Sequence, residues 1–284
     1  MNMELKFELP PSGFKRLFYD IETSYCIGSF WRPSWKANIS HDNIIFDSAI
    51  ICICWKWEGQ KKVYSASWED GCDKALLLSF LEYALKADEI VAHNGDRFDE
   101  PWIRTRCMVH NIECPPKFKS VDTLKKVRRH FNLPSNRLDF IGERYLDGGK
   151  SPMSFEDWNR IIKPLIPKML GYDVELPKDY HDAMDKMVMY CKKDVQLLED
   201  AFHRVQPYIE ATTHTGAQFG FGRWSCPKCG DDRPHINQTR TSKAGVKTHQ
   251  MKCVKGCGYY TISNAVMMQK LTAELEEKIA NSAK

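Results

Sequence analysis

Segments of two kinds alternate along the chain as far as Ile209, and this alternation is the strongest constraint on the fold. Short runs rich in aromatic and aliphatic residues are typical of strands, and longer runs with apolar side chains on a helical period are typical of helices. Such alternation predicts a mixed α/β layer. Strands are expected at Leu17–Ile21, Ala49–Trp57, Lys62–Ser67 and Glu89–His93, and helices at 73–87, Phe98–His110, Val121–Phe131, Arg137–Tyr145, Ser154–Ile162 and Asp182–Ile209.

The pattern stops at Thr212–Gly222, a stretch rich in small residues that we interpret as a hinge. A compact module follows from Arg223 to about Ile262, and Asn264 is placed to cap a terminal helix. The expected organisation is therefore a large domain over 1–211, the hinge over 212–222, the module over 223–262 and a helix over 263–284.

Charge is distributed unevenly between these parts. The net charge of the whole chain is +4, but residues 1–211 hold 30 basic and 32 acidic side chains, whereas residues 212–262 hold 8 basic and 2 acidic ones. An anionic partner is therefore expected on the later segment, unless metal ions supply positive charge to the earlier one.

Cysteine use indicates the compartment. The chain has 11 cysteines, an odd number, and its N-terminus lacks a signal-peptide pattern, which argues against a secreted disulfide framework. The apolar stretch Ala49–Trp55 is far too short to span a bilayer. We expect a cytoplasmic protein with reduced thiols and no membrane partner.

Acidic residues occur at three places where a fold could gather them. Asp20 and Glu22 alternate on a predicted strand and so point to one face, and Asp99 begins a predicted helix. Tyr190 and Asp194 lie four residues apart on the longest predicted helix and share a face. Each signal alone also fits an ordinary surface acid, whereas crowded carboxylates would call for a hard divalent cation.

The order, spacing and context of these residues resemble the tyrosine subclass of the DEDD superfamily of 3′-to-5′ exonucleases. The resemblance covers about residues 14–207 and implies a ribonuclease H-like mixed sheet flanked by helices. Further stretches look like standalone phage-type relatives of proofreading domains, which implies a role in phage replication with DNA as the preferred substrate. These stretches are Ser120–Leu124, Arg137–Asp139 and Gly148–Lys150.

The resemblance also implies roles for individual residues. Asp20 would bridge two Mg²⁺ or Mn²⁺ ions, Glu22 and Asp194 would complete the water-activating site, Asp99 would hold the second ion, and Tyr190 would orient the attacking water. Thr23 and Asn94 match positions near the terminal nucleotide, although they could equally satisfy loop backbone, and Phe98 is a further candidate substrate contact. Trp31 and Trp35 could stack a base or simply cover the sheet. His93 is expected to be a buried strand residue, and Asp122 and Asp139 helix-terminal acids.

Two short cysteine pairs lie in the C-terminal module. Cys226 and Cys229 are separated by two residues, Cys253 and Cys257 by three, and a glycine follows each pair. Four thiolates grouped in this way fit a structural tetrahedral Zn²⁺, and the whole resembles a zinc ribbon with a hairpin around Lys243-Ala244-Gly245. The wider second pair leaves His235 or His249 open as substitute ligands.

Basic and aromatic residues around that hairpin could bind nucleic acid through its backbone and bases, although they also fit a solvated basic face. Arg240, Lys243 and Lys247 are the candidate contacts.

The sequence as a whole predicts a two-metal exonuclease that acts on single-stranded DNA or DNA ends, alone or beside a separate polymerase, in the host cytoplasm if phage-encoded. An exoribonuclease with the same site, or a non-catalytic binding protein acting through the ribbon, remain alternatives.

Overall fold

In the computed structural model, described residues are 15–32, 40–114, 118–146, 148, 153–209, 214, 216, 221–227, 230–256 and 258–282. The chain forms two compact units, one over Arg16–Pro207 and one that contains Tyr208–Lys284. Trp35, Cys229, Cys257 and most of the predicted hinge lie outside the described residues. Among those that are described, no helix is long and apolar enough to cross a membrane.

The larger unit is built on a mixed sheet of five strands in the order β5-β4-β1-β6-β7. The strands are β1 (Arg16–Thr23), β4 (Ile50–Trp57), β5 (Tyr64–Ser67), β6 (Glu89–Ala92) and β7 (Ser120–Asp122). β1 pairs antiparallel with β4 and parallel with β6, and β6 pairs parallel with β7. The carboxyl ends of β1, β6 and β7 therefore meet at one edge of the sheet.

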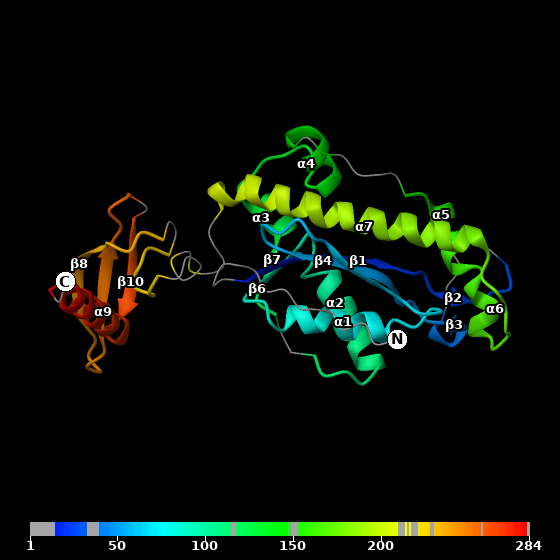
Figure 1. The fold of residues 1–284 in the computed structure, drawn as a ribbon, viewed down its shortest axis with the longest axis horizontal. Helices are drawn as coiled ribbons and strands as arrows, with labels where there is room; N and C mark the ends of the chain where they lie inside the picture. Colours follow the sequence, from blue (N-terminus) through cyan, green and yellow to red (C-terminus); the bar gives the residue numbers. More distant parts are fainter. Residues whose placement is uncertain are drawn as a thin grey trace. The chain divides into compact units, whose positions relative to one another are not determined.

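Helices cover both faces of this sheet. The long helix α7 (Lys178–Val205) crosses one face, and α1 (Lys74–Ala84) and α2 (Asp99–Val109) lie on the other (Figure 1). All eight residues of β4 are buried between these layers, which explains its continuous apolar run. The remaining helical elements are α3 (Thr123–His130), α4 (Leu138–Tyr145), α5 (Phe155–Ile162), α6 (Leu165–Met169), η1 (His41–Asn43) and η2 (Gln206–Tyr208), and β2 (Ile27–Gly28) pairs with β3 (Ile44–Phe46).

This architecture confirms the predicted mixed α/β sheet flanked by helices, with local corrections. The helix predicted over Val121–Phe131 begins only at Thr123, because Ser120–Asp122 pairs with β6 as a strand. Three residues are too few to show a strand period, so only the parallel partner reveals them. The long helix begins at Lys178, after Pro177, and ends at Val205, earlier than predicted.

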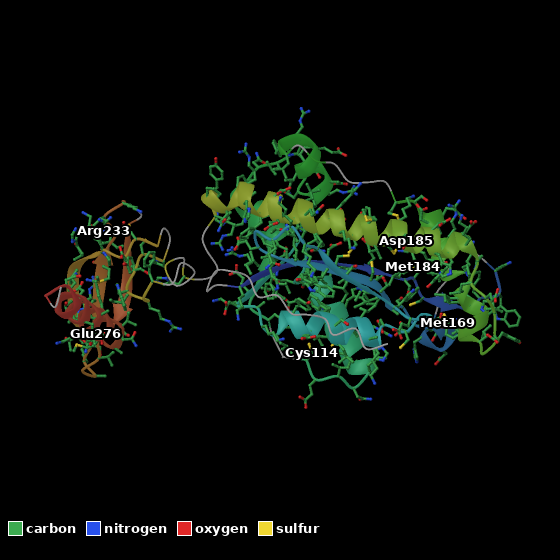
Figure 2. The ribbon with its side chains drawn as sticks, viewed as in Figure 1. Cys114, Met169, Met184, Asp185, Arg233 and Glu276 are labelled. Carbon is green, nitrogen blue, oxygen red and sulfur yellow. The ribbon has the colours of Figure 1, made fainter. Side chains whose placement is uncertain are left out.

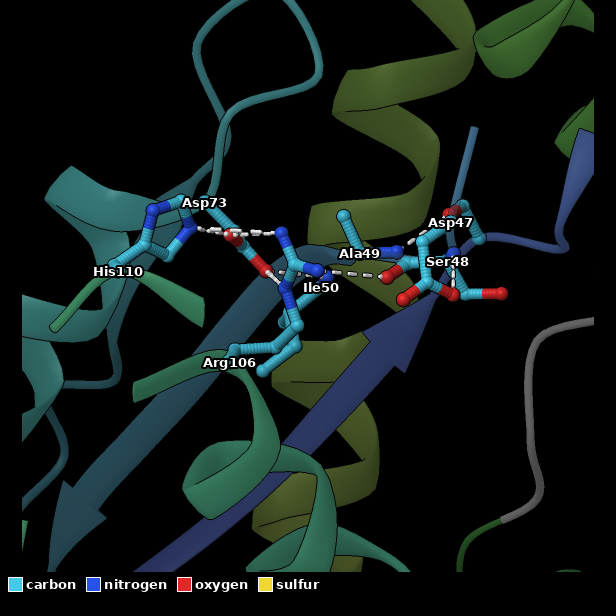
Figure 3. A network of polar contacts seen from close by, with 8 residues as sticks. Asp47, Ser48, Ala49, Ile50, Asp73, Arg106 and His110 are labelled. Atoms are coloured by element: carbon cyan, nitrogen blue, oxygen red, sulfur yellow. Dashed lines mark hydrogen bonds and ion pairs between the residues drawn. The ribbon is translucent and has the colours of Figure 1, made fainter. Parts of the chain in front are cut away.

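A buried charge network joins α1, α2 and the start of β4 (Figure 3). Asp73 is fully buried and accepts hydrogen bonds from Arg106 Nε (2.6 Å), Arg106 Nη2 (3.0 Å) and the N–H of Ile50 (2.9 Å). His110 Nε2 lies 2.5 Å from the same carboxylate, and Arg106 also donates to the Ser48 carbonyl at 3.1 Å. The network fixes α2, whose first residue is Asp99, against β4.

The smaller unit holds a three-stranded antiparallel sheet and a helix. β8 (His235–Thr241), β9 (Lys247–Lys252) and β10 (Tyr259–Ser263) pair in the order β10-β9-β8, and α9 (Asn264–Ser282) follows. The predicted hairpin is confirmed, with Gly245 at φ +78° in its turn. The cap of α9 differs from the prediction, because the Ser263 hydroxyl accepts the Val266 N–H at 3.3 Å. The Asn264 side chain instead contacts His249 Nε2, at 3.1 Å.

Candidate active site

Three of the predicted acids meet where β1 passes beneath α7. Asp20, Glu22 and Asp194 each offer a carboxylate oxygen, and these oxygens all lie within 4.8 Å of one another. Asp194 is buried, and the other two are partly exposed. Three carboxylates this close repel one another unless a cation lies between them, so their chemistry fits a hard divalent ion.

Packing between α7 and the sheet produces this meeting. The buried side of α7 follows a helical period through Met187, Cys191, Val195 and Leu198, and Asp194 is buried beside this row. The Cys191 thiol contacts the Asp20 carbonyl at 3.4 Å and the Asp20 carboxylate at 3.7 Å. One and a half turns beyond Asp194, Glu199 pairs with Lys56 of β4 and holds the helix in register.

Asp99 lies close to this group without belonging to it. Its carboxylate accepts the N–H of Ile21, the residue between Asp20 and Glu22. The pairing of β6 with β1 ends at Phe18, so it leaves that part of β1 open to Asp99. Asp99 Oδ1 is buried and has no hydrogen-bond partner. Such an orphaned oxygen is costly, and a metal ion would relieve the cost.

Burial and, less strongly, the neighbouring Asp122 carboxylate together raise the pKa of Asp99 to about 7, against backbone N–H groups that lower it. Asp122 caps α3 by accepting the Lys125 N–H at 3.2 Å, which confirms it as a helix-terminal acid. The same oxygen accepts the N–H of Asn94 at 3.0 Å. Asp122 thereby holds Asn94 at φ +73°, in the turn that leads to Asp99.

The remaining predicted residues of this unit lie around the same edge. Tyr190 is partly buried on α7, one turn before Asp194, and Thr23 ends β1. Phe98 is 40 % exposed, directly before α2. His93 follows β6 and is only partly buried, which corrects the expected buried strand residue; its ring contacts Thr123 Oγ1 and the Asn136 carbonyl. Trp31 is completely exposed, so the sheet-cover interpretation is wrong for it.

A pocket of about 420 Å³ opens beside Asp20 and contains side chains that sequence reasoning gave no role. Its lining includes Asn94, Arg128 and Arg137. The signal was present in the sequence, because α3 is strongly basic from Lys125 to Arg129. Arg137 directly precedes α4, and only the packing of α3 and α4 brings it and Arg128 into one pocket with Asp20.

In the smaller unit, the two described cysteines of the predicted zinc site are both buried. Each lies in a tight turn: the Gly230 N–H donates to the Cys226 carbonyl at 2.9 Å, and the Gly256 N–H donates to the Cys253 carbonyl at 3.2 Å. Both glycines have positive φ, which a side chain would strain. Similar turns at two buried thiols fit a thiolate-bound ion, whose other two ligands would lie outside the described residues.

The contacts of His249 argue against it as the substitute ligand. It is buried, and its two ring nitrogens already contact Thr239 Oγ1 at 3.0 Å and Asn264 Oδ1 at 3.1 Å. His235 and the candidate contacts Arg240, Lys243 and Lys247 are all exposed on the hairpin.

Comparisons with known proteins identify the superfamily of the chain. No curated protein matches the chain. Among solved structures, a family B DNA polymerase from the hyperthermophilic archaeon Pyrobaculum calidifontis is similar at 13% identity and a TM-score of 0.48, over 82% of this chain and 31% of the polymerase. The chain thus spans about a third of that polymerase's length. Residues 47–206 match the RNase_H superfamily, from just before β4 to the end of α7. That match covers more than half of the chain, which therefore belongs to the ribonuclease H superfamily.

Proposed function

We propose that this chain is a metal-dependent 3′-to-5′ exonuclease that hydrolyses single-stranded DNA or DNA ends. The observation that carries the proposal is the group of Asp20, Glu22 and Asp194, with oxygens within 4.8 Å of one another at the edge of a ribonuclease H-like sheet. Superfamily membership supports a nuclease that uses divalent metals. The polarity and the preference for DNA rest on the resemblance of the sequence motifs to the tyrosine subclass of DEDD exonucleases.

The chemistry divides between the metal ions and the side chains. When bound, two divalent cations stabilise charge on the attacking and leaving oxygens of the phosphodiester. Asp20, Glu22 and Asp194 would hold one ion, and Asp20 with Asp99 the other. Tyr190 would donate or accept one hydrogen bond to orient the attacking water, and with a usual pKa near 10 a tyrosine stays protonated in this role. Arg128 and Arg137 would attract the phosphate backbone to the pocket beside Asp20.

The test is digestion of oligonucleotides labelled at the 5′ end or the 3′ end, as single-stranded DNA, duplex DNA and RNA, with and without added Mn²⁺. We expect stepwise removal from the 3′ end of single-stranded DNA, and loss of at least 100-fold in rate for Asp20→Asn or Asp194→Asn. Asp185→Asn is the matched control, because Asp185 is an exposed acid on the same helix (Figure 2). Full activity in Asp20→Asn would refute the site, and preference for RNA would favour the exoribonuclease alternative.

We also propose that the smaller unit binds one structural Zn²⁺ through Cys226, Cys229, Cys253 and Cys257. Two buried thiols at similar glycine turns support this ligand set. A closed four-thiolate site leaves no position for substrate, so its contribution would be folding energy. The exposed Arg240, Lys243 and Lys247 would then present positive charge to a nucleic-acid strand, either DNA or RNA. A separate polymerase would be a further partner.

A further inference from the structure

An aromatic pocket lies directly beyond the acid-bearing end of β1. It has a volume of about 380 Å³ and is lined by Ser24, Tyr25, Phe155 and Trp158. Ser24 and Tyr25 follow Glu22 by two and three residues, whereas Phe155 and Trp158 come from α5, more than a hundred residues later. The pocket is thus formed by the same chain segment that presents two of the candidate metal ligands.

Hydrogen bonds hold the walls of this pocket in place. The Trp158 indole N–H donates to the Thr23 carbonyl at 3.1 Å, and the Tyr25 hydroxyl donates to Asn159 Oδ1 at 3.0 Å. Phe155 begins α5, where a capping box between Ser154 and Asp157 fixes the first turn. Because the polar groups of Trp158 and Tyr25 are satisfied within the protein, a ligand would meet mainly ring faces.

The position of the pocket relative to the acids follows from α7. Lys186 pairs with Asp157 of α5 at 2.7 Å, which ties α5 to α7 eight residues before Asp194. At 1.5 Å per residue, that separation is about 12 Å along the helix. A stacked strand advances about 3.4 Å per nucleotide, so the pocket lies within about four nucleotides of the acids.

The composition of the walls selects the part of a nucleotide that would bind. The four lining residues include no cation and no amide side chain, so they offer a phosphate little attraction. The Phe155 ring is 71 % exposed, and it stands at the first position of a helix whose backbone is fixed by a capping box. Exposed, preorganised aromatic rings stack on bases without reading their sequence. The Tyr25 and Phe155 rings are only 5.8 Å apart between centroids, so a base would lie against them rather than between them.

We propose that the pocket of Tyr25, Phe155 and Trp158 binds one unpaired base of the strand, within the last four nucleotides before the cleaved end. The inference rests on the proposed nuclease function, and it adds a sequence-independent stacking site for single-stranded nucleic acid. It further implies that a duplex end must fray before it can occupy the site, because a paired base does not expose its face to the pocket.

The test is binding of the full chain to 5′-fluorescent single-stranded oligonucleotides that carry one abasic nucleotide, moved stepwise through the first five positions from the 3′ end. Anisotropy is measured without added divalent metal, and a gel verifies that the oligonucleotides stay intact. For the wild type we expect the dissociation constant to rise about 10-fold at one abasic position only. Phe155→Ala should bind the intact strand about 10-fold more weakly and lose that position-specific sensitivity.

Tyr172→Ala is the control, because Tyr172 is also an exposed aromatic residue, at 66 %, but does not line the pocket. Uniform affinity of the wild type for every abasic strand, or an unchanged abasic profile in Phe155→Ala, would overturn the pocket assignment. A normal profile in a protein that digests no strand with Mn²⁺ would support the pocket and refute the exonuclease proposal, so the two failures are distinguishable.

Discussion

Replacing Arg106 with alanine should destabilise the larger unit by about 3 kcal/mol, at the lower end of the range for breaking a buried ion pair. The substitution removes three donated hydrogen bonds, two to Asp73 and one to the Ser48 carbonyl. Asp73, with no exposed surface, would keep only the Ile50 N–H and His110. Because these two contacts still stabilise the carboxylate, we expect a cost at the lower end of the range for a broken buried ion pair. Because most domains are stable by only 5–15 kcal/mol, about a fifth or more of the total would be lost.

The measurement is equilibrium unfolding in urea, followed by tryptophan fluorescence. Every tryptophan except Trp224 lies between Arg16 and Pro207, so the signal reports mainly on this unit. Lys86→Ala provides the control, since Lys86 and Glu82 form an exposed pair whose loss should cost less than about 1 kcal/mol. An Arg106→Ala cost no larger than that of the control would refute the reasoning.

A second variant separates lost charge pairing from lost packing. The double substitution Asp73→Asn with Arg106→Met removes the buried carboxylate and its guanidinium partner together, so it should recover part of the loss.

Unfolding at acid pH provides a further check of the Asp73 network. Burial raises the pKa of Asp73, but the hydrogen bonds from Arg106, Ile50 and His110 lower it below its usual 3.8 overall. The stabilisation is therefore complete above about pH 4 and is lost as the pH falls through the lowered pKa. The stability gap between wild type and Arg106→Ala should narrow over that range.

Three further predictions concern α5, the turn before α2 and the zinc site. Burial would raise the pKa of Asp157, but hydrogen bonds from Lys186 and Ser154 lower it to about 2, so its stabilising effect should disappear between about pH 4 and pH 2. Urea midpoints of Asp157→Asn should accordingly vary less with acid pH than those of the wild type, and parallel curves would contradict this. Asp122→Ala should lower the free energy of unfolding in urea by about 1 kcal/mol, because α3 loses its cap. It should also slow digestion, because the Asn94 N–H loses the carboxylate that holds the turn before α2. Unchanged stability and an unchanged digestion rate would contradict both roles. Elemental analysis should find one zinc ion per chain in the wild type and none in Cys226→Ser. Removal of the zinc by a chelator should unfold the β8–β10 sheet, which circular dichroism would detect. A zinc-free protein that is equally stable would exclude a structural ion.

Much of the fold could be predicted because its signals are local. The aromatic and aliphatic run of β4 and the uninterrupted helical period of α7 reflect burial of each element on its own. The position of Asp194 four residues after Tyr190 is likewise a property of one helix. Local spacing therefore assigned Asp20 to a strand and Asp194 to a helix before any packing was known.

Tertiary structure decided how those elements meet. β7 exists as a strand only because β6 offers a parallel partner, and Asp99 reaches Ile21 only because the β1–β6 pairing ends early. The aromatic pocket joins Tyr25 to Phe155 and Trp158 across a separation that no local period records. Side-chain type and periodicity are encoded within a few residues, whereas distances between oxygens, ring faces and cations depend on packing over the whole chain. The sequence by itself determined which side chains stand at which positions of each element, and the tertiary structure determined which of them lie close enough to act together.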